Sequence, residues 1–581
     1  MKKVFFSAFI IFICFISACK KQNFLDKTTT TDLSEGAVFS DSSRSMDFLA
    51  NIYASVDFSF SLSRFNGAAG LDACSDEAEG PLSTGVTTYN QFASGSVSAF
   101  NIATDAWNTP YGQIRAVNQF LKHLPTIPFN DILKNRTKGE AIFLRAWYYS
   151  IMLKHYGGIP LIGDSIYTES DKINTVRNTY EDCVNYITAQ CDNAADLLPL
   201  SYAGLDYGRV TKGAAMSLKA RVLLYAASPL FNGGAETGDA NLKAIVSYPS
   251  FDANRWKLAA DAAKAVMDLS IYSLNTDNTT KPGYGFYNLF QKRVNNEYIF
   301  ARMEPDNKDL ENLWRPPSRG GGSTSGSFPY QNLVDAFEMK NGLPITDSAS
   351  GYDPNNPYVN RDPRLDYTVT HNLSLIYVAY DALRPVYTYD GEPKGDGFGA
   401  GTPTGYYGNK MCNDNVIPNY FFNMSSRCYP MIRYADILLM YAEAMNEFSG
   451  PNQDVYNAVE QIRQRAGLDP YQLKTGMSKE EMRAAIQHER RVEFAFEGSR
   501  FWDVRRWKIA DQTDNTEMKG MRVKKDASGN YTYLIEDVRK HNFRTNMYLW
   551  PIPQSETAKS PDLLQNPGYS TDAGHNKLLL E

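Results

Sequence analysis

The chain has 581 residues, of which 43% are hydrophobic, 13% aromatic and 21% charged, so it can bury a large core and wholesale disorder is excluded. Its 59 Lys and Arg against 65 Asp and Glu give a formal net charge of -6, without the basic excess that nucleic-acid binding needs. At roughly 150 residues per domain, length alone predicts about four domains. The 37 Tyr, 31 Phe and 7 Trp suit either cores or surfaces that grip flat ligands.

The N-terminus has the pattern of an exported lipoprotein. Lys2 and Lys3 precede an apolar run at residues 4–16, which is shorter than the roughly 17 residues needed to span a bilayer and is typical of a signal peptide. Residues 16–19, Ile-Ser-Ala-Cys, resemble a bacterial lipobox, which implies cleavage before Cys19 and attachment of a lipid to its sulfur. Lys20 suits export to the outer membrane. An ordinary secretion signal with an incidental cysteine is the alternative.

We therefore expect a signal peptide at residues 1–18 and a lipid-anchored tether at residues 19–41. No later segment has 18 consecutive apolar residues, so the lipid is expected to be the only membrane anchor, on the outer membrane and facing the cell exterior.

Helical periodicity dominates two blocks of the chain. The first block predicts helices at 106–124, 136–156, 180–198, 212–231 and 255–268, and the second at 432–448, 453–466, 479–496 and 500–510. Helices of about twenty residues with short turns and Ala-rich, aromatic-rich faces are typical of tetratricopeptide packing. Between the blocks, residues 275–429 are rich in Gly and Pro and predict loops with short strands at most.

Five cysteines remain once Cys14 is cleaved off and Cys19 is acylated, and an odd number cannot all pair within one chain. Cys183 and Cys191 share a predicted helix and lie too far apart along it to bridge. Cys412 and Cys428 flank a loop-like stretch and could pair in an oxidising envelope.

A series of local motifs then follows in a fixed order along the chain. They are AIFLRAWYY at 141–149, HYGGIP at 155–160, LVDAFEMKNG at 333–342, NRDPR at 360–364, RYADILLMYAEA at 433–444, EGSRFWDVRRW at 497–507, WPIP at 550–553, Glu556 and QNPGY at 565–569. Together with the lipobox, they resemble the SusD/RagB family of Bacteroidetes surface lipoproteins over nearly the whole mature chain.

The resemblance implies a mostly α fold: a SusD-like α-superhelix built on tetratricopeptide-like helix pairs, with an irregular loop-rich cap containing short strands. It replaces the four-domain estimate by one unit at 42–581, made of a helical block at 42–274, a loop-rich insertion at 275–429, and a C-terminal helical block and tail at 430–581. It further implies a protein that is not an enzyme and binds an oligosaccharide, or in some members a peptide. Such a protein is a lid on a SusC-like TonB-dependent β-barrel transporter. The family allows a bound calcium ion, but no EF-hand spacing occurs here, and we expect no other metal or cofactor.

Charged signature residues alternate with aromatic ones at 490–507, and we interpret them as ion pairs that hold the second helical block to the first. The aromatic residues of the same motifs, and Trp107, are expected in the core.

Two loop segments, 64–100 and 307–330, combine aromatic rings with Asp, Asn and Arg, the side chains that sugars need for stacking and hydrogen bonding. Trp314 is the best candidate because it lies among Pro and Gly and is expected to be exposed; local packing or contact with the barrel is its alternative. The candidate ligand-binding residues are Trp314, Arg315, Tyr89, Asp72, Asp76, Asn66, Arg64 and Tyr330.

The acidic residues near position 75 leave other functions open. Asp72, Asp76 or Glu77 could serve a surface glycoside hydrolase, but a glycosidase needs two carboxylates across a sugar, a geometry that sequence does not show. A solvated acidic loop is the plainer interpretation. A structural lid or adhesin is a third class.

Overall fold

The computed structural model describes residues 34–66, 68–81, 87–168, 170–171, 175–322, 324–379, 382–416 and 424–569. The expected signal peptide and the lipidation residue Cys19 lie outside the described residues. The fold is mostly helical with short strands, which confirms the predicted fold class. The division of the chain at residues 274 and 429 stays a prediction.

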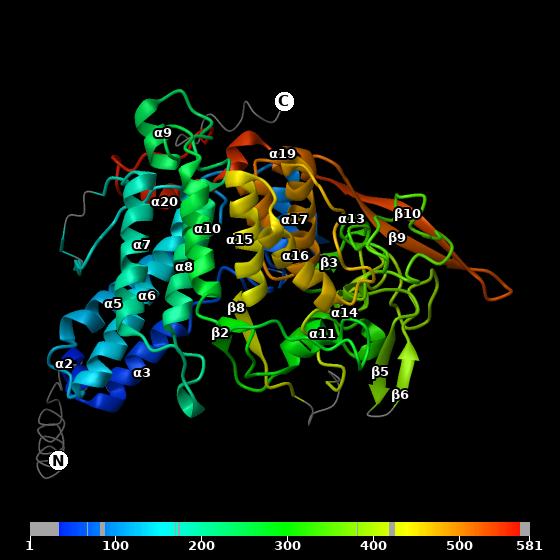
Figure 1. Cartoon of the computed structure of the whole chain (residues 1–581), viewed down its shortest axis with the longest axis horizontal. Helices are drawn as coiled ribbons and strands as arrows, with labels where there is room; N and C mark the ends of the chain where they lie inside the picture. The colour runs from blue at the N-terminus through cyan, green and yellow to red at the C-terminus, as the bar shows by residue number, and fades with distance from the viewer. Residues whose placement is uncertain are drawn as a thin grey trace, which may run out of the picture.

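The first helical block is a row of antiparallel helices in which each packs on the next (Figure 1). Its long members are α3 (Ser42–Tyr53), α5 (Asp105–His123), α6 (Asp131–Tyr156), α7 (Tyr180–Leu197), α8 (Lys212–Ala227) and α10 (Asn254–Met267), with short helices α2 (Glu35–Phe39), α4 (Thr88–Ser94) and α9 (Ala240–Val246). Helix α6 begins five residues earlier than predicted because the Asn130 side chain caps it. Helix α8 ends four residues earlier than predicted, just before Pro229.

The second helical block packs against the first through α10 and α15. It contains α15 (Tyr434–Ser449), α16 (Gln453–Ala466), α17 (Lys479–Glu493), α18 (Arg500–Arg506) and α19 (Ala510–Thr513), and α20 (Gln554–Thr557) follows near the C-terminus. The bounds of α16 match the prediction, because Asn452 caps its start and Gly467 ends it in a left-handed conformation. Residue 432, expected to begin a helix, instead belongs to a strand.

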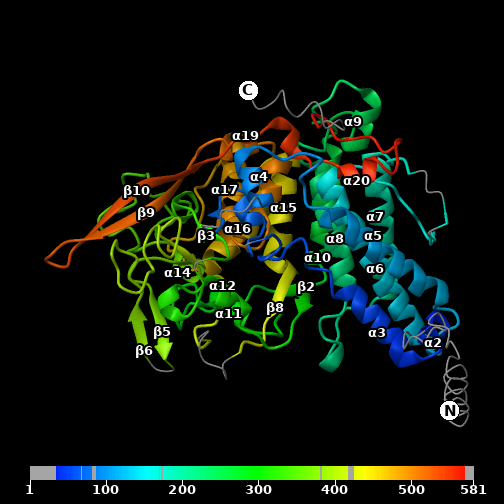
Figure 2. The ribbon, with the colours of Figure 1, turned by 180° about the vertical axis from the view of Figure 1, so that it is seen from behind.

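The segment between the blocks contains the predicted short strands, paired in two-stranded antiparallel sheets, and also short helices that were not predicted. The helices are α11 (Tyr284–Gln291), α12 (Asp309–Trp314), α13 (Gln331–Val334) and α14 (Arg364–Thr368). The pairs are β2 (Tyr298–Met303) with β8 (Cys428–Arg433), β5 (Leu375–Ala379) with β6 (Ala382–Pro385), β4 (Val369–Thr370) with β7 (Tyr407–Gly408), and β1 (Ala78–Glu79) with β3 (Phe328–Pro329). The β1–β3 pair joins an N-terminal loop to this cap, and Figure 2 shows α4 lying across the second helical block.

A long hairpin, formed by β9 (Glu517–Lys525) and β10 (Tyr531–Lys540), projects from the body of the molecule (Figure 1). This hairpin was not predicted from the sequence. Residues 387–390 run beside its first strand, where the Asp390 backbone N–H donates to the Val523 carbonyl at 2.8 Å.

The aromatic motif of α6 lies in the core, as predicted. Trp147 donates from its indole to the Val56 carbonyl at 3.0 Å, and Tyr148 donates to the Ile52 carbonyl at 2.6 Å. Both side chains are buried, so they hold the end of α3 and the loop that follows it against α6.

All five described cysteines are free, so the expected pairing of Cys412 with Cys428 is wrong. Cys428 begins β8 and lies opposite Met303 of β2, where its sulfur is 3.4 Å from the Met303 sulfur. The β-sheet register, rather than nearness along the chain, determines what this thiol faces.

Candidate ligand-binding surfaces

Trp314, expected to be exposed, is a core residue with 1% of its surface accessible. It ends α12, and its ring lies so close to Gly408 of β7 that a β-carbon there would fall 2.6 Å from it. The Phe496 ring packs on it edge to face at 5.1 Å. Arg315 is equally buried and donates to the Asn409 side-chain oxygen at 2.7 Å. The expectation of exposure fails because loops distant in sequence cover this helix.

The acidic loop is also buried. Asp76 accepts from Arg500 and Arg491, which hold the pKa of its carboxyl well below the ordinary range against the opposing effect of burial. Burial raises the pKa of Asp72 to about 6, and burial together with Asp72 holds the pKa of Glu77 well above its ordinary value. These carboxyl groups have no open face for a sugar, so neither the solvated-loop interpretation nor a hydrolase built on them fits the structure.

The remaining candidates divide between buried and exposed positions. Tyr330 is buried and donates to Glu79 at 2.8 Å, and buried Tyr89 packs on Gly80. The Arg64 guanidinium pairs with Asp105 at 2.7 Å, and only 2% of the Arg64 side chain is exposed. Asn66 is exposed and stays a candidate for ligand contact.

A group of half-exposed tyrosines lies on the hairpin and the segment beside it. We define the tyrosine surface as Tyr387, Tyr389, Lys525 and Tyr531. The Lys525 ammonium lies 5.1 Å from the Tyr389 ring centroid, 5.7 Å from that of Tyr531 and 5.9 Å from that of Tyr387. Lys525 itself is exposed, so the rings and the cation face solvent together.

Charged side chains border this surface. Arg522 lies 3.7 Å from Asp390 and 3.4 Å from Glu536, and its guanidinium lies over the Phe398 ring. Arg319, from the segment at 307–330 that was singled out in the sequence, contacts the chain just before Tyr387. It donates to the carbonyls of Arg384 and Pro385 at 3.0 and 2.9 Å. Stacking rings with hydrogen-bonding groups at their edge are what a sugar ring requires. These tyrosines were not predicted from the sequence. The alternating pattern of residues 531–540 was a signal for Tyr531 alone, and no local pattern indicated Tyr387 and Tyr389.

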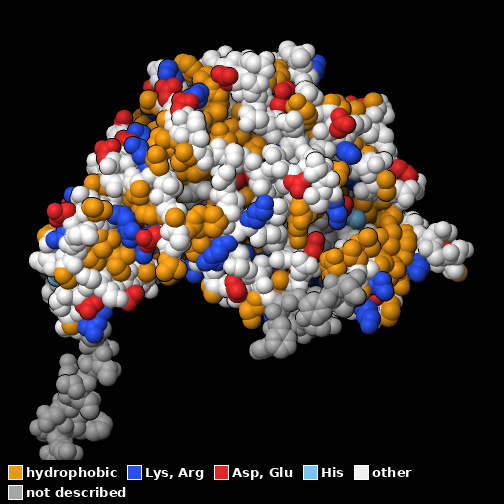
Figure 3. Space-filling view, turned by 60° about the horizontal axis from the view of Figure 1, so that its bottom comes forward, with side chains coloured by type: hydrophobic (Ala, Val, Ile, Leu, Met, Phe, Trp, Pro, Cys, Tyr) orange, Lys and Arg blue, Asp and Glu red, His pale blue; other side chains and the backbone are white. Residues whose placement is uncertain are grey.

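Other exposed apolar side chains lie nearby in the fold. Leu375 of β5 and Leu383 of β6 are 64% and 41% exposed. Figure 3 shows hydrophobic side chains gathered on the loop-rich side of the molecule. This side therefore offers apolar as well as polar contacts.

The first helical block carries a groove of about 800 Å³ between α5, residues 160–168 and residues 556–563. Its lining includes Trp107, Tyr111 and Tyr167. Trp107 is buried as predicted, and Tyr111 already donates its hydroxyl to the Pro160 carbonyl at 2.9 Å. Tyr167 offers a ring that is 37% exposed. The groove is large enough for a small ligand but presents fewer free aromatic faces than the tyrosine surface.

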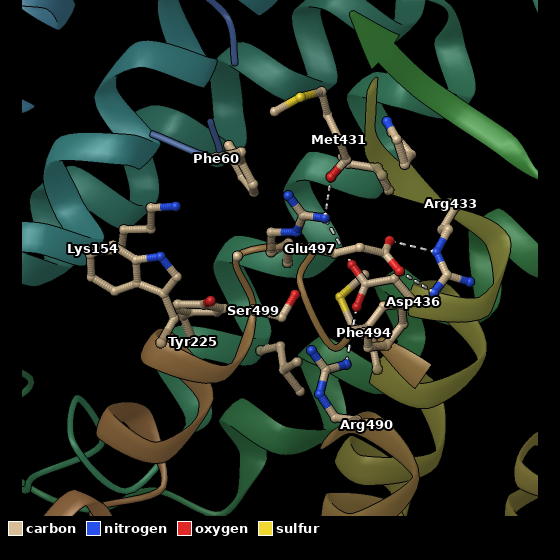
Figure 4. Close-up of a pocket in the computed structure, with 17 residues that line it drawn as sticks. Phe60, Lys154, Tyr225, Met431, Arg433, Asp436, Arg490, Phe494, Glu497 and Ser499 are labelled. Carbon is tan, nitrogen blue, oxygen red and sulfur yellow. Dashed lines mark hydrogen bonds and ion pairs between the residues drawn. The ribbon is translucent and has the colours of Figure 1, made fainter. Parts of the chain in front are cut away.

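The charged signature residues form buried ion pairs, which confirms their structural interpretation. Arg433 donates to Glu493 at 2.6 Å. Figure 4 shows that Arg433 also pairs with Glu497, at 2.8 Å, and that Arg490 pairs with Asp436, at 3.0 Å. The partners of residues 490–507 come from three parts of the chain. Arg364 and Lys410 belong to the loop-rich segment, and Asp76 of the first block pairs with Arg491 and Arg500. The others, Arg433, Asp436, Glu443, Arg465 and Asp514, belong to the second block itself. Arg221 of α8, which pairs with Asp436 at 2.8 Å, links the two helical blocks directly.

Among the residues that the structure describes, no group of three or more His, Cys, Asp or Glu side chains is placed to hold a metal ion. Within the same residues no helix has the length and apolar character needed to cross a bilayer.

Stacked helix pairs, a loop-built cap and aromatic rings presented to solvent define a helical ligand-binding scaffold. The chain belongs to the SusD family, whose model matches residues 251–569; a second family model, described as starch-binding associating with the outer membrane, matches residues 24–224. Both agree with the resemblance found in the motifs.

Individual proteins support the same assignment. SusD-like protein P2 of Formosa agariphila is 24% identical over 507 residues, covering 82% of this chain and 81% of that protein. A crystal structure of a SusD-like protein from Bacteroides fragilis is 28% identical with a TM-score of 0.74, covering 92% of this chain and 99% of that one. A SusD-like carbohydrate binding protein from the same organism is 23% identical with a TM-score of 0.71, covering 91% of this chain and all of that one.

Proposed function

We propose that the protein is a cell-surface lipoprotein that captures an oligosaccharide and delivers it to a SusC-like TonB-dependent transporter in the outer membrane, without catalysing a reaction. Membership of the SusD family supports the role, and the family model described as starch-binding and associating with the outer membrane supports the ligand class and the location. The carbohydrate-binding structural neighbour is a further argument for a glycan.

The tyrosine surface is the proposed contact with the glycan, and its geometry carries the proposal. Three half-exposed rings within 6 Å of the Lys525 ammonium offer flat faces to the CH groups of sugar rings. Arg522 and Asp390 beside them can donate to and accept from sugar hydroxyls. Hydroxyl groups of the tyrosines add further donors, so stacking and hydrogen bonding are available on one face.

Calorimetry with matched panels of oligosaccharides and peptides tests the ligand class. We expect saturable heats with at least one oligosaccharide and none with the peptides. Binding of peptides alone would replace the glycan by a peptide in the same role. Binding of neither would favour the structural lid or adhesin. Chromatography of the bound sugar after long incubation should recover it intact, and shortened products would overturn the non-enzymatic assignment.

Delivery and anchoring need separate tests. We expect the full chain to co-purify from outer membranes with a TonB-dependent β-barrel identified by mass spectrometry. A Cys19→Ala variant should lose its lipid and leave the membrane fraction. A full chain that remains in membranes without its lipid, or that is recovered without a barrel, would contradict these parts of the proposal.

A further inference from the structure

Lys154 has an unusual environment in the cleft between the two helical blocks. It lies near the end of α6, half-buried, with its ammonium 4.4 Å from the Phe60 ring centroid and 4.6 Å from a ring of Trp502. No hydrogen bond or ion pair from the described residues reaches this ammonium. An ammonium has three N–H donors, and no acceptor in the described part of the chain satisfies them, so they are available to a small ligand.

The ammonium faces a pocket of about 40 Å³ that is bordered by both blocks. Figure 4 shows the Lys154 side chain and the Ser499 hydroxyl turned toward its centre. Arg221 of α8 lines the pocket as well, so two cations of the first block face a hydroxyl that precedes α18 of the second.

The carboxylates around the pocket are committed to other cations. Asp436 accepts from Arg221 at 2.8 Å and from Arg490 at 3.0 Å. Glu497 accepts from Arg433 at 2.8 Å and from Lys410 at 2.6 Å. The pocket lining therefore contains four cationic side chains (Lys154, Arg221, Arg433, Arg490) against these two anionic ones. Arg433 and Arg490 have further carboxylate partners behind the lining, which leaves Lys154 as the cation without one.

We propose that this pocket binds a small inorganic anion of chloride size, held by the Lys154 ammonium, the Arg221 guanidinium and the Ser499 hydroxyl. The volume admits one such ion with a water molecule and is too small for a sugar, since a single water already needs roughly 10–15 Å³. The anion joins α6 and α8 to the start of α18, so it stabilises the contact between the helical blocks.

The electrostatics of Lys154 agree with this site. Desolvation lowers the pKa of Lys154 well below its ordinary value, and the positive charges of Arg221 and Arg64 lower it further. A bound anion offsets all three effects, so occupancy and the charged state of Lys154 stabilise each other.

The test compares melting temperatures in sodium bromide or chloride with those in sodium gluconate, whose anion does not fit the pocket, at equal ionic strength. We expect a saturable rise with the halides for the wild type. Lys154→Met, which keeps a long apolar side chain, should lose the halide dependence and melt no lower than the wild type in gluconate. The matched control is Lys257→Met on α10, whose side chain is 51% exposed; it should keep the full halide response.

Crystals soaked in bromide provide a second readout that does not depend on a variant. We expect an anomalous peak between Lys154 and Arg221. The proposal is overturned by equal melting temperatures in halide and gluconate, by an unchanged halide response in Lys154→Met, or by an empty pocket in the bromide crystals. A peak without any effect on melting would mark an adventitious ion only and would also overturn it.

Discussion

Asp76 accepts two hydrogen bonds from Arg500, from Nε and Nη2 at 2.8 Å each, across 424 positions of the sequence. Arg491 adds a third contact at 2.8 Å. The pairing fastens the N-terminal loop to the helix α18 of the family motif. A residue that the sequence offered as a sugar contact is thus part of the scaffold beneath the cap.

Replacing Asp76 by Asn should destabilise the fold, because it leaves two buried guanidinium groups without their counter-charge. Loss of one partner of a buried pair costs about 3–5 kcal/mol, and urea unfolding measures it. The matched control is Asp537→Asn on the exposed face of β10, where a salt bridge with Lys519 is worth at most about 1 kcal/mol. An equal decrease in the free energy of unfolding in the two variants would show that the ion pair of Asp76 does not stabilise the fold.

Trp314→Ala should lower the free energy of unfolding by about 3–5 kcal/mol, because it opens a cavity between Gly408 and Phe496. Trp314→Phe should lose less. Glycan affinity per folded molecule, measured by calorimetry below the melting temperature, should not change. An affinity loss in Trp314→Ala with unchanged stability would restore this residue as a ligand contact.

Burial raises the pKa of Asp514 to about 7, with the charge of Arg505 opposing the shift. The folded state therefore holds this proton more tightly than the unfolded state. The stability that it contributes is full below about pH 4 and is lost as the pH rises toward 7. Asparagine does not titrate, so Asp514→Asn does not lose this stability. The free energy of unfolding of the variant minus that of the wild type should therefore be larger at pH 8 than at pH 5. Urea unfolding at both pH values measures the gain; a constant difference would contradict the assigned shift.

The five described thiols should be unreactive in the native protein, because all are buried and burial raises each thiol pKa. In protein lacking residues 1–19, Ellman's reagent should label none of them at neutral pH, and all five in denaturant without reductant. Only three reactive thiols in denaturant would reveal a disulfide, and would revive the pairing of Cys412 with Cys428.

Local signals in the sequence predicted the scaffold well. Both ends of helix α16 could be predicted from the sequence, because Asn452 caps its start and Gly467 ends it. The hairpin of β9 and β10 was missed, although alternating residues and the turn around Gly529 are signals of the same local kind.

The candidate site could be predicted less well, because exposure is decided by contacts between distant segments. Trp314 lies among Pro and Gly, yet Gly408, 94 positions later, packs on its ring. Asp76 has Arg500 as its partner, which no local pattern indicates. In the segment at 307–330, which was predicted to contact the ligand, Arg319 instead donates to the carbonyls of Arg384 and Pro385 and so supports the segment that carries Tyr387, a role that no local pattern indicates.

Calorimetry of tyrosine variants with the oligosaccharide found in the panel is the most direct test of the account. Tyr389→Ala and Tyr531→Ala each remove a stacking face and should weaken binding about tenfold or more, which corresponds to about 1.4 kcal/mol. The matched control, Tyr167→Ala in the groove of the first helical block, should bind like the wild type. Full affinity in the first two variants together with lost affinity in Tyr167→Ala would contradict the account and move the glycan to the groove.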